Sequence, residues 1–348
     1  MPRDCRNRDG PVAADGFAAC LTHEIGTHPW LARDIPSGVR VIVDNDFAGD
    51  PDDLPQLAHH LLSPGAEVRA VISSHLAVGD PIYPGSDSAA YGLERVRRML
   101  ATMGCEEDGR LLLGTTAALT DRATPQDSPG VDAIIAEARA DDERPLFVAV
   151  GGGLTDVASA LLRAPDIADR MTVVWIGGPE YPDLAEPAPD HRHPEYNLNI
   201  DIAAARVVFE DSDVPVWQVP RDAYRQALVS ETELRTRVRP AGPLGAFLYA
   251  ELDALVEKVA QMRGYQHATY VLGDQPLVLL TSLLAIFEPA PASCRSVLRP
   301  GPVFADDGTP TGRDGREVRV FTHIDNRLMF EDMYAALAEF AAWQAGSA

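Results

Sequence analysis

The stretch from Val41 to Leu62, "VIVDNDFAGDPDDLPQLAHHLL", places five aspartates within ten residues, directly after an apolar run. Carboxylates held this close repel one another, and burying them is costly unless something neutralises their charge. A bound cation such as Ca²⁺, which takes carboxylate, carbonyl and water oxygens, would do so. The alternative is a solvated turn that caps the following helix, since Asp, Gly and Pro are ordinary turn residues. The five aspartates are Asp44, Asp46, Asp50, Asp52 and Asp53.

The apolar run before these aspartates is the first of several that alternate with helical patterns. Strands that are apolar throughout and separated by helices are typical of a parallel sheet covered on both faces. We therefore predict an N-terminal extension over residues 1–36 and one large α/β domain over 37–348, with a mostly parallel, open, Rossmann-like sheet and helices on both faces. The expected strands are 39–43, 68–72, 110–113, 146–150, 172–176, 215–219 and 317–321, and the expected helices are 53–62, 88–103, 131–140, 155–164, 201–210, 243–263 and 330–344.

Composition excludes several classes of protein. The chain has 348 residues, 46% of them hydrophobic, and a net charge of −22, which argues against nucleic-acid binding because phosphate-tracking surfaces are basic. The four cysteines are scattered without a CxxC pair, so neither a zinc site nor a disulfide framework is indicated. No secretory leader and no apolar run of membrane-spanning length occur, and we predict a cytoplasmic protein that does not enter membranes.

The loops that follow the expected strands carry most of the polar side chains of interest. In parallel sheets ligands bind at the carboxyl ends of the strands, so we expect these loops to converge. They are "DNDFAGDPDD", "SSHLAVGDP" with His75 and Asp80, "GGGLTD", and the proline-rich "GGPEYPDLAEPAPDHRHPEYN" with His193. We therefore expect His75, Asp80 and His193 near the site.

Two other classes of enzyme that act on phosphate compounds were compared with this loop. "DxD" after the first strand resembles the nucleophile loop of haloacid-dehalogenase-like, Mg²⁺-dependent phosphohydrolases, here Asp44 and Asp46. That family also needs a lysine on a later loop, and the single lysine, Lys258, lies in the middle of a helical pattern. A P-loop nucleotidase is excluded because no GxxxxGK[ST] occurs.

Over residues 39–330 the chain resembles the nucleoside hydrolase family, the calcium-dependent N-ribohydrolases often called inosine–uridine preferring. The family's "DxDPGxDD" loop is matched by "DNDFAGDPDD", with two extra residues between Asp46 and Asp52. "VAVGGGLTDVASALL" is similar to "GPLTNIALAL", and "WIGG" is similar to the family's "MGG". "EYNLNIDIAAA" (195–205) follows "EFNxxxDPEAA" without a gap, and "LGDQPLVLL" (272–280) resembles "HDPxAVA".

The resemblance implies a nucleoside-hydrolase fold and hydrolysis of the N-glycosidic bond of a ribonucleoside, or a related ribosyl compound, to ribose and free base. It implies a Ca²⁺-bound water activated by Asp46, and a homodimer or homotetramer. The implied calcium ligands are Asp46, Asp50, Asp53, the carbonyl of Gly151, and Asp274. Asp52, Glu195, Asn197, Asp80 and His193 are the expected substrate-binding residues.

One position departs from the family in a way that bears on the reaction. The family's leaving-group histidine is Gly273 here, so we consider His75 and His267 as replacements. Gly273 and the longer aspartate loop leave two alternatives open. In the first alternative, the chain is a calcium-dependent nucleoside- or sugar-binding protein without turnover. In the second, it hydrolyses modified or pyridine nucleosides, whose good leaving group needs no acid.

Overall fold

A computed structural model of the chain describes residues 23–33, 36–106, 108–189, 193–266, 268–287, 293–312 and 315–346. Its centre is an eight-stranded sheet in the order β11-β14-β8-β7-β6-β2-β3-β5. All neighbouring pairs are parallel except β11 with β14, which confirms the predicted mostly parallel α/β sheet. The strands are β2 (Val39–Asn45), β3 (Ala66–Ser73), β5 (Leu111–Leu113), β6 (Leu146–Val150), β7 (Thr172–Ile176), β8 (Val216–Val219), β11 (Arg295–Pro300) and β14 (Glu317–His323).

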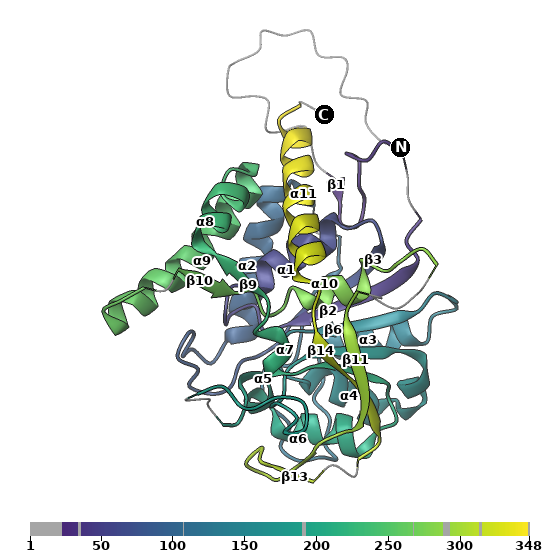
Figure 1. Cartoon of the computed structure of the whole chain (residues 1–348). Coiled ribbons are helices and arrows are strands. Elements are labelled where there is room, and N and C mark those ends of the chain that lie inside the picture. The colour runs from purple at the N-terminus through teal and green to yellow at the C-terminus, as the bar shows by residue number, and fades with distance from the viewer. Residues whose placement is uncertain are drawn as a thin grey trace.

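Helices cover both faces of this sheet (Figure 1). Successive side chains of a strand point to opposite faces, and in β2 Val41 and Val43 join one buried cluster while Ile42 joins the other. The first face is covered by α1 (Asp53–Leu62), α2 (Ser88–Met103), α9 (Gly242–Arg263), α10 (Pro276–Thr281) and α11 (Asn326–Gln344). The second is covered by α3 (Pro129–Ala138), α4 (Thr155–Arg163) and α6 (Ile202–Arg206).

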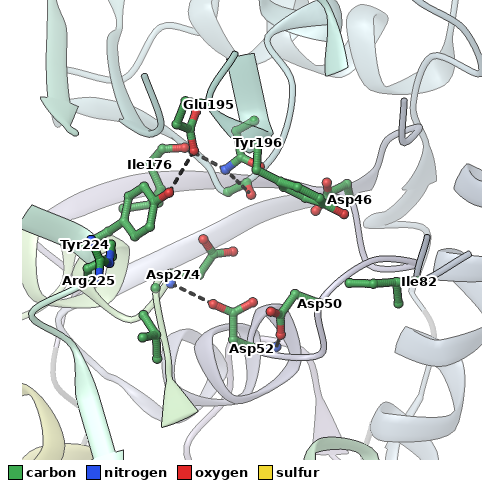
Figure 2. Close-up of a pocket in the computed structure, with 14 residues that line it drawn as sticks. Asp46, Asp50, Asp52, Ile82, Ile176, Glu195, Tyr196, Tyr224, Arg225 and Asp274 are labelled. Carbon is green, nitrogen blue, oxygen red and sulfur yellow. Dashed lines mark hydrogen bonds between the residues drawn. The ribbon is translucent and has the colours of Figure 1, made fainter. Parts of the chain in front are cut away.

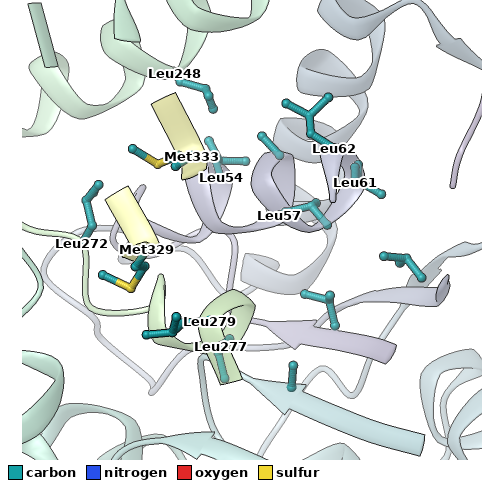
Figure 3. Close-up of a cluster of buried hydrophobic side chains, with 14 of the residues drawn as sticks. Leu54, Leu57, Leu61, Leu62, Leu248, Leu272, Leu277, Leu279, Met329 and Met333 are labelled. Atoms are coloured by element: carbon teal, nitrogen blue, oxygen red, sulfur yellow. The ribbon is translucent and has the colours of Figure 1, made fainter. Parts of the chain in front are cut away.

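Helix α1 directly follows the aspartate loop and is buried along its whole length. Its leucines, Leu54 and Leu57 among them, lie near Met329 and Met333 of α11 and Leu277 of α10 (Figure 3). Burying one such side chain stabilises the fold by about 1.5–3 kcal/mol. This packing fixes the position of the loop that carries the aspartates.

Some elements differ from the prediction. The edge strand β11 was not predicted, because its sequence "RSVLRP" is half-exposed and carries two arginines and a proline. The helix expected over 201–210 is shorter, since α6 passes into a π-helical turn, Val207–Asp211. The remaining short elements are β1 (His23–Glu24), β4 (Cys105–Glu106), η1 (Pro165–Arg170), α5 (Tyr196–Ile200), α7 (Arg221–Tyr224), β9 (Leu228–Ser230), α8 (Glu231–Glu233), η3 (Leu234–Val238), β10 (Thr269–Val271), β12 (Val303–Phe304) and β13 (Pro310–Gly312).

Part of the expected N-terminal extension packs on the domain. Strand β1 pairs in parallel with β4, and Trp30 is buried against Phe340 and Trp343 of α11. Within the described ranges, no helix has the length and apolar character needed to cross a bilayer. The cytoplasmic location and the homodimer or homotetramer stay predictions.

Candidate active site

The carboxyl ends of β2, β6, β7 and β8 open into one cavity of about 240 Å³ (Figure 2). The loops after these parallel strands converge there, as expected for an open α/β sheet. Residues from seven separate parts of the chain form its wall. They are Asp46, Asp50, Asp52, Ile82, Gly151, Ile176, Glu195, Tyr196, Asn197, Tyr224, Arg225, Val271, Gly273 and Asp274.

Three carboxylates meet at the floor of the cavity. One oxygen each of Asp52, Asp53 and Asp274 lies within 4.8 Å of the others. Asp52 is the N-cap residue of α1, yet its side chain makes no capping hydrogen bond. Its Oδ2 instead accepts a hydrogen bond of 3.2 Å from the backbone N–H of Asp274. Helix capping therefore does not account for this aspartate.

Asn45, the last residue of β2, ties this floor together. Its Nδ2 donates to Asp53 Oδ1 at 2.7 Å, to Gln56 Oε1 at 3.0 Å and to Asp274 Oδ2 at 3.1 Å. Its Oδ1 accepts from the backbone N–H of Gly151 at 3.0 Å. One buried amide thus orients two carboxylates from opposite ends of the sequence and the loop after β6.

The loop after β6 approaches the carboxylates so closely that only glycine fits. A Cβ on Gly151 would lie 2.1 Å from Asp274 Oδ2, and one on Gly152 would lie 3.1 Å from the Asp46 Cγ. The carbonyl of Gly151 accepts a 3.0 Å hydrogen bond from Asn197 Nδ2, which leaves its second lone pair for another partner.

Asp50 and Asp46 complete the acidic side of the cavity. Asp50 Oδ1 accepts hydrogen bonds from the Tyr270 hydroxyl and from the backbone N–H of Asp52. Asp46 follows β2 and is 3% exposed, and its carboxylate lies outside the group of three on the floor. Tyr270 thereby joins the site by holding Asp50.

Burial raises the pKa of these aspartates. For Asp46, Asp52 and Asp274 burial is the main cause and neighbouring carboxylates add to it, so each pKa lies well above its ordinary value. Burial raises the pKa of Asp53 to about 6. So many carboxylates cannot all be ionised here without added positive charge.

The opposite wall is built for hydrogen bonding to a polar ligand (Figure 2). Glu195 Oε1 accepts from the Tyr224 hydroxyl at 2.9 Å, while its Oε2 accepts from the backbone N–H groups of Gly178 and Leu198. Glu195 therefore also caps α5, and Asp201 caps α6 through the N–H of Ala204.

Asn197 is oriented by the backbone. Its Nδ2 donates to the carbonyls of Gly151 and Ile176, at 3.0 and 2.7 Å. The side-chain oxygen is then the atom left to contact a ligand, as an acceptor.

The residues present fit a hard cation. Asp46 Oδ2 and Asp53 Oδ2 are buried and have no hydrogen-bond partner among the described residues. A buried carboxylate oxygen without a partner is costly, and a cation would satisfy it. The donors are all oxygens, as hard cations such as Ca²⁺ and Mg²⁺ prefer. Asp52, Asp53 and Asp274 are placed together to hold it. Asp46 and Gly151 line the same cavity and can add a carboxylate and a carbonyl oxygen.

The histidines expected near the site lie elsewhere or outside the described residues. His75 is 3% exposed, and its ring nitrogens face the Leu76 carbonyl and the Thr155 hydroxyl at 3.0 and 2.9 Å, so it does not line the cavity. His267 falls outside the described residues. His193 and Asp80 line a second, adjoining cavity, with Asp80 Oδ2 accepting from the Tyr196 hydroxyl at 2.7 Å.

The sequence reasoning missed several wall residues. Tyr196 stands between two predicted residues of the "EYN" motif, and that position was the available signal. Tyr224 and Arg225 belong to the single turn α7 and the residue after it, where no periodic pattern marks them. At Gly273 an added Cβ would lie 3.3 Å from Asp52 Oδ2 and 3.4 Å from the Tyr224 ring, so the position faces the cavity without offering an acid.

Residues 41–331 match the sequence model of the family described as inosine-uridine preferring nucleoside hydrolase. The chain belongs to this nucleoside hydrolase family. An inosine-uridine preferring nucleoside hydrolase of Leishmania major is 34% identical over 120 residues, which are 34% of this chain and 35% of that protein. The aligned segment therefore spans about a third of that relative's length.

Solved structures of nucleoside hydrolases share the fold. A purine-preferring ribonucleoside hydrolase from Gardnerella vaginalis superposes with a TM-score of 0.62 at 18% identity, covering 87% of this chain and 99% of its own. An inosine-uridine preferring nucleoside hydrolase from Bacillus anthracis gives a TM-score of 0.61 at 16% identity, covering 86% and 99%. The family match sets the phosphohydrolase alternative aside. Lys258, on α9, donates through Nζ to the carbonyls of Pro81 and Ile82 and does not line the acidic cavity.

Proposed function

We propose that this nucleoside hydrolase family member hydrolyses the N-glycosidic bond of a ribonucleoside, or a related ribosyl compound, in the cavity at the carboxyl edge of the sheet. The observation that carries the proposal is the juxtaposition of the buried carboxylates on the floor with Glu195 and Asn197 on the facing wall. A ribose presents several hydroxyls, and this wall presents carboxylate and amide oxygens that accept from them.

Ca²⁺ is the proposed cofactor, held by Asp46, Asp52, Asp53, Asp274 and the Gly151 carbonyl. When bound, it supplies the positive charge that makes a neighbouring water easier to deprotonate and offsets the repulsion between the carboxylates. This set adds Asp52 to the ligands expected from the family motif, because Asp52 lies with Asp53 and Asp274. It omits Asp50, whose Oδ1 is engaged by Tyr270 and the Asp52 N–H.

Asp46 is the proposed general base. Its carboxylate lines the cavity beside the group of three, so one of its oxygens can face the cation while the other takes a water proton. The water oxygen bonds to the anomeric carbon, the bond to the base nitrogen breaks, and the base leaves with the electron pair. Glu195 and Asn197 orient the sugar for an oxocarbenium-like transition state, a form that glycoside hydrolysis passes through.

The leaving base receives little acid assistance from the described wall. Position 273 is glycine, and the Tyr224 hydroxyl donates to Glu195. Burial, and then the neighbouring Glu195 carboxylate, raises the pKa of Tyr224 well above its ordinary value. We infer a preference for ribosyl compounds whose leaving group departs without strong acid catalysis, such as pyridine or modified nucleosides.

A substrate panel tests this function. Reducing-sugar and free-base release would be measured with purine, pyrimidine and pyridine ribonucleosides in calcium buffer. We expect ribose to be released from at least one of these nucleosides, and fastest from the pyridine nucleosides. Calcium-dependent nucleoside binding with no release over long incubation would contradict the proposal and support the binding-protein alternative.

A further inference from the structure

A second cavity of about 460 Å³ adjoins the acidic one and is larger than it. The two share Tyr196, Tyr224 and Arg225 in their walls. The second is formed by the loops 77–81 and 193–194, by residues 188–189, and by helix α7 with the residue after it. A compound whose sugar lies over the carboxylates therefore has room to extend past these three shared residues.

The charged side chains of the wall differ between the two cavities. The acidic cavity carries Asp46, Asp50, Asp52, Glu195 and Asp274, with Arg225 at its edge. Among the described residues, the second carries Arg221, Arg225, His193 and Asp80. Asp80 is engaged on both oxygens, because Oδ1 accepts from the N–H groups of Ile82 and Tyr83 and Oδ2 accepts from Tyr196.

Arg225 is the cation that stands at the junction of the two cavities. The backbone of α7 holds it, since its N–H donates to the Arg221 carbonyl at 3.2 Å. Its side chain is exposed, and no hydrogen bond or ion pair joins its guanidinium to a residue in the described ranges. Its neighbour Arg221 differs, because Glu180 engages it through two hydrogen bonds. Arg225 therefore has its donors available for a ligand.

We propose that the second cavity binds an anionic group of the ribosyl substrate through Arg225. The substrate class is then a ribosyl compound that carries a phosphate or a carboxylate outside the ribose ring. A guanidinium presents forked donors that match phosphate and carboxylate oxygens. The proposal rests on the proposed function, since it assigns a substrate class to the same site. One hydrogen-bonded charge pair of this kind corresponds to a tenfold to about a hundredfold preference.

The test compares pairs of substrates that differ by one anionic group, on the full chain with calcium. Uridine and nicotinamide riboside lack the group, and their partners, uridine 5′-monophosphate and nicotinic acid riboside, carry it as a phosphate or a carboxylate. kcat/KM would be measured for wild type, Arg225→Gln, Arg225→Lys and the control Arg263→Gln. Arg263 is an exposed arginine at the end of α9 and lines neither cavity.

We expect wild type to prefer a partner that carries the anionic group. Arg225→Gln should lower the ratio of kcat/KM with the anionic group to kcat/KM without it by about tenfold to a hundredfold. Arg225→Lys would recover part of the ratio, and Arg263→Gln would leave it unchanged. The pair that responds identifies the anion as a ribose phosphate or a base carboxylate. A ratio that Arg225→Gln does not change overturns this inference alone. No release from any of the four compounds overturns the proposed function as well.

Discussion

Asp46 is the residue on which the proposed proton transfer depends. Replacing it with asparagine keeps its size and removes the basic oxygen, so Asp46→Asn should lower kcat by about 10²–10⁴-fold. Ribose release at saturating calcium and substrate measures this. Asp213→Asn, at an exposed aspartate, is the matched control and should retain wild-type turnover. If Asp46→Asn turned over within twofold of wild type, Asp46 would not be the base.

A substitution at Gly151 tests the floor of the cavity, because it adds side-chain volume without changing charge. The methyl group of Gly151→Ala would lie 2.1 Å from Asp274 Oδ2 and would displace that carboxylate, whereas Gly38→Ala meets no atom within 4 Å. We expect Gly151→Ala to weaken calcium binding by about tenfold or more, and Gly38→Ala to leave it unchanged. Titration calorimetry on both variants provides the measurement. Equal affinities would show that Asp274 is not a ligand.

At this scale the sequence predicted the residues that carry a family motif and missed those that do not. Asp46, Glu195, Asn197 and Asp274 stand in recognisable patterns and line one cavity. Helix α7 is a single turn with no periodicity to read, so Arg225 could not be placed by pattern. His75 follows the right strand, but its ring turns to Thr155, and no local pattern fixes a side-chain direction of that kind.

Helix α1 connects the aspartates to the core through a buried polar chain. Asn45 donates to Gln56, the Gln56 amide meets His60 Nδ1, and His60 Nε2 meets the Thr281 hydroxyl at 2.8 Å. Every polar group in this chain has a partner, which a buried network requires in order to stabilise the fold. This network therefore supports the carboxylates of the cavity floor from the side of the core.

We predict that the buried hydrogen-bond network of Asn45, Gln56, His60 and Thr281 makes an acid-sensitive contribution to the stability of the fold. Burial, and then the neighbouring His59, lowers the pKa of His60 to about 3 from 6.5, so the folded state keeps His60 neutral. Between pH 6.5 and 3 the unfolded state binds the proton and the folded state does not, and this contribution is lost as pH falls through that window. The limiting slope for one group is about 1.4 kcal/mol per pH unit.

Urea unfolding of metal-free wild type and His60→Gln measures this contribution, because the aspartate titrations are common to both proteins. At pH 7 the variant should be less stable. The difference in unfolding free energy should shrink as pH falls from 6.5 towards 4. A difference that stays constant over this range would show that His60 does not titrate between the two states.

Among the elements, the buried parallel strands and α1 were predictable because their apolar pattern follows from burial on both faces. Strand β11 was not, since an edge strand is half-exposed and its arginines and proline mask the pattern. The π-helical turn after α6 was also missed, because its apolar residues continue the spacing of an ordinary helix. A hydrophobic pattern in the sequence indicates burial, so it is weaker where an element lies at the edge of the sheet.

For the whole molecule, the cluster of buried carboxylates couples cation binding to folding. A ligand that binds only the folded state at a hundred times its Kd stabilises it by about 2.7 kcal/mol. We therefore expect saturating calcium to raise the Tm by several degrees, and Asp274→Asn to lose most of that rise. Differential scanning calorimetry with calcium and with chelator checks this. An identical Tm in both buffers would argue against a structural calcium site.

We expect nucleoside hydrolysis by this protein to require the cation held by these carboxylates. The most direct measurement is turnover of the best nucleoside against free calcium, beside calcium binding by titration calorimetry on the same preparation. We predict that chelator abolishes turnover, that turnover recovers over the range of calcium concentration in which calcium binds, and that each chain binds one ion. Full turnover in chelator, with calcium binding confirmed, would contradict it.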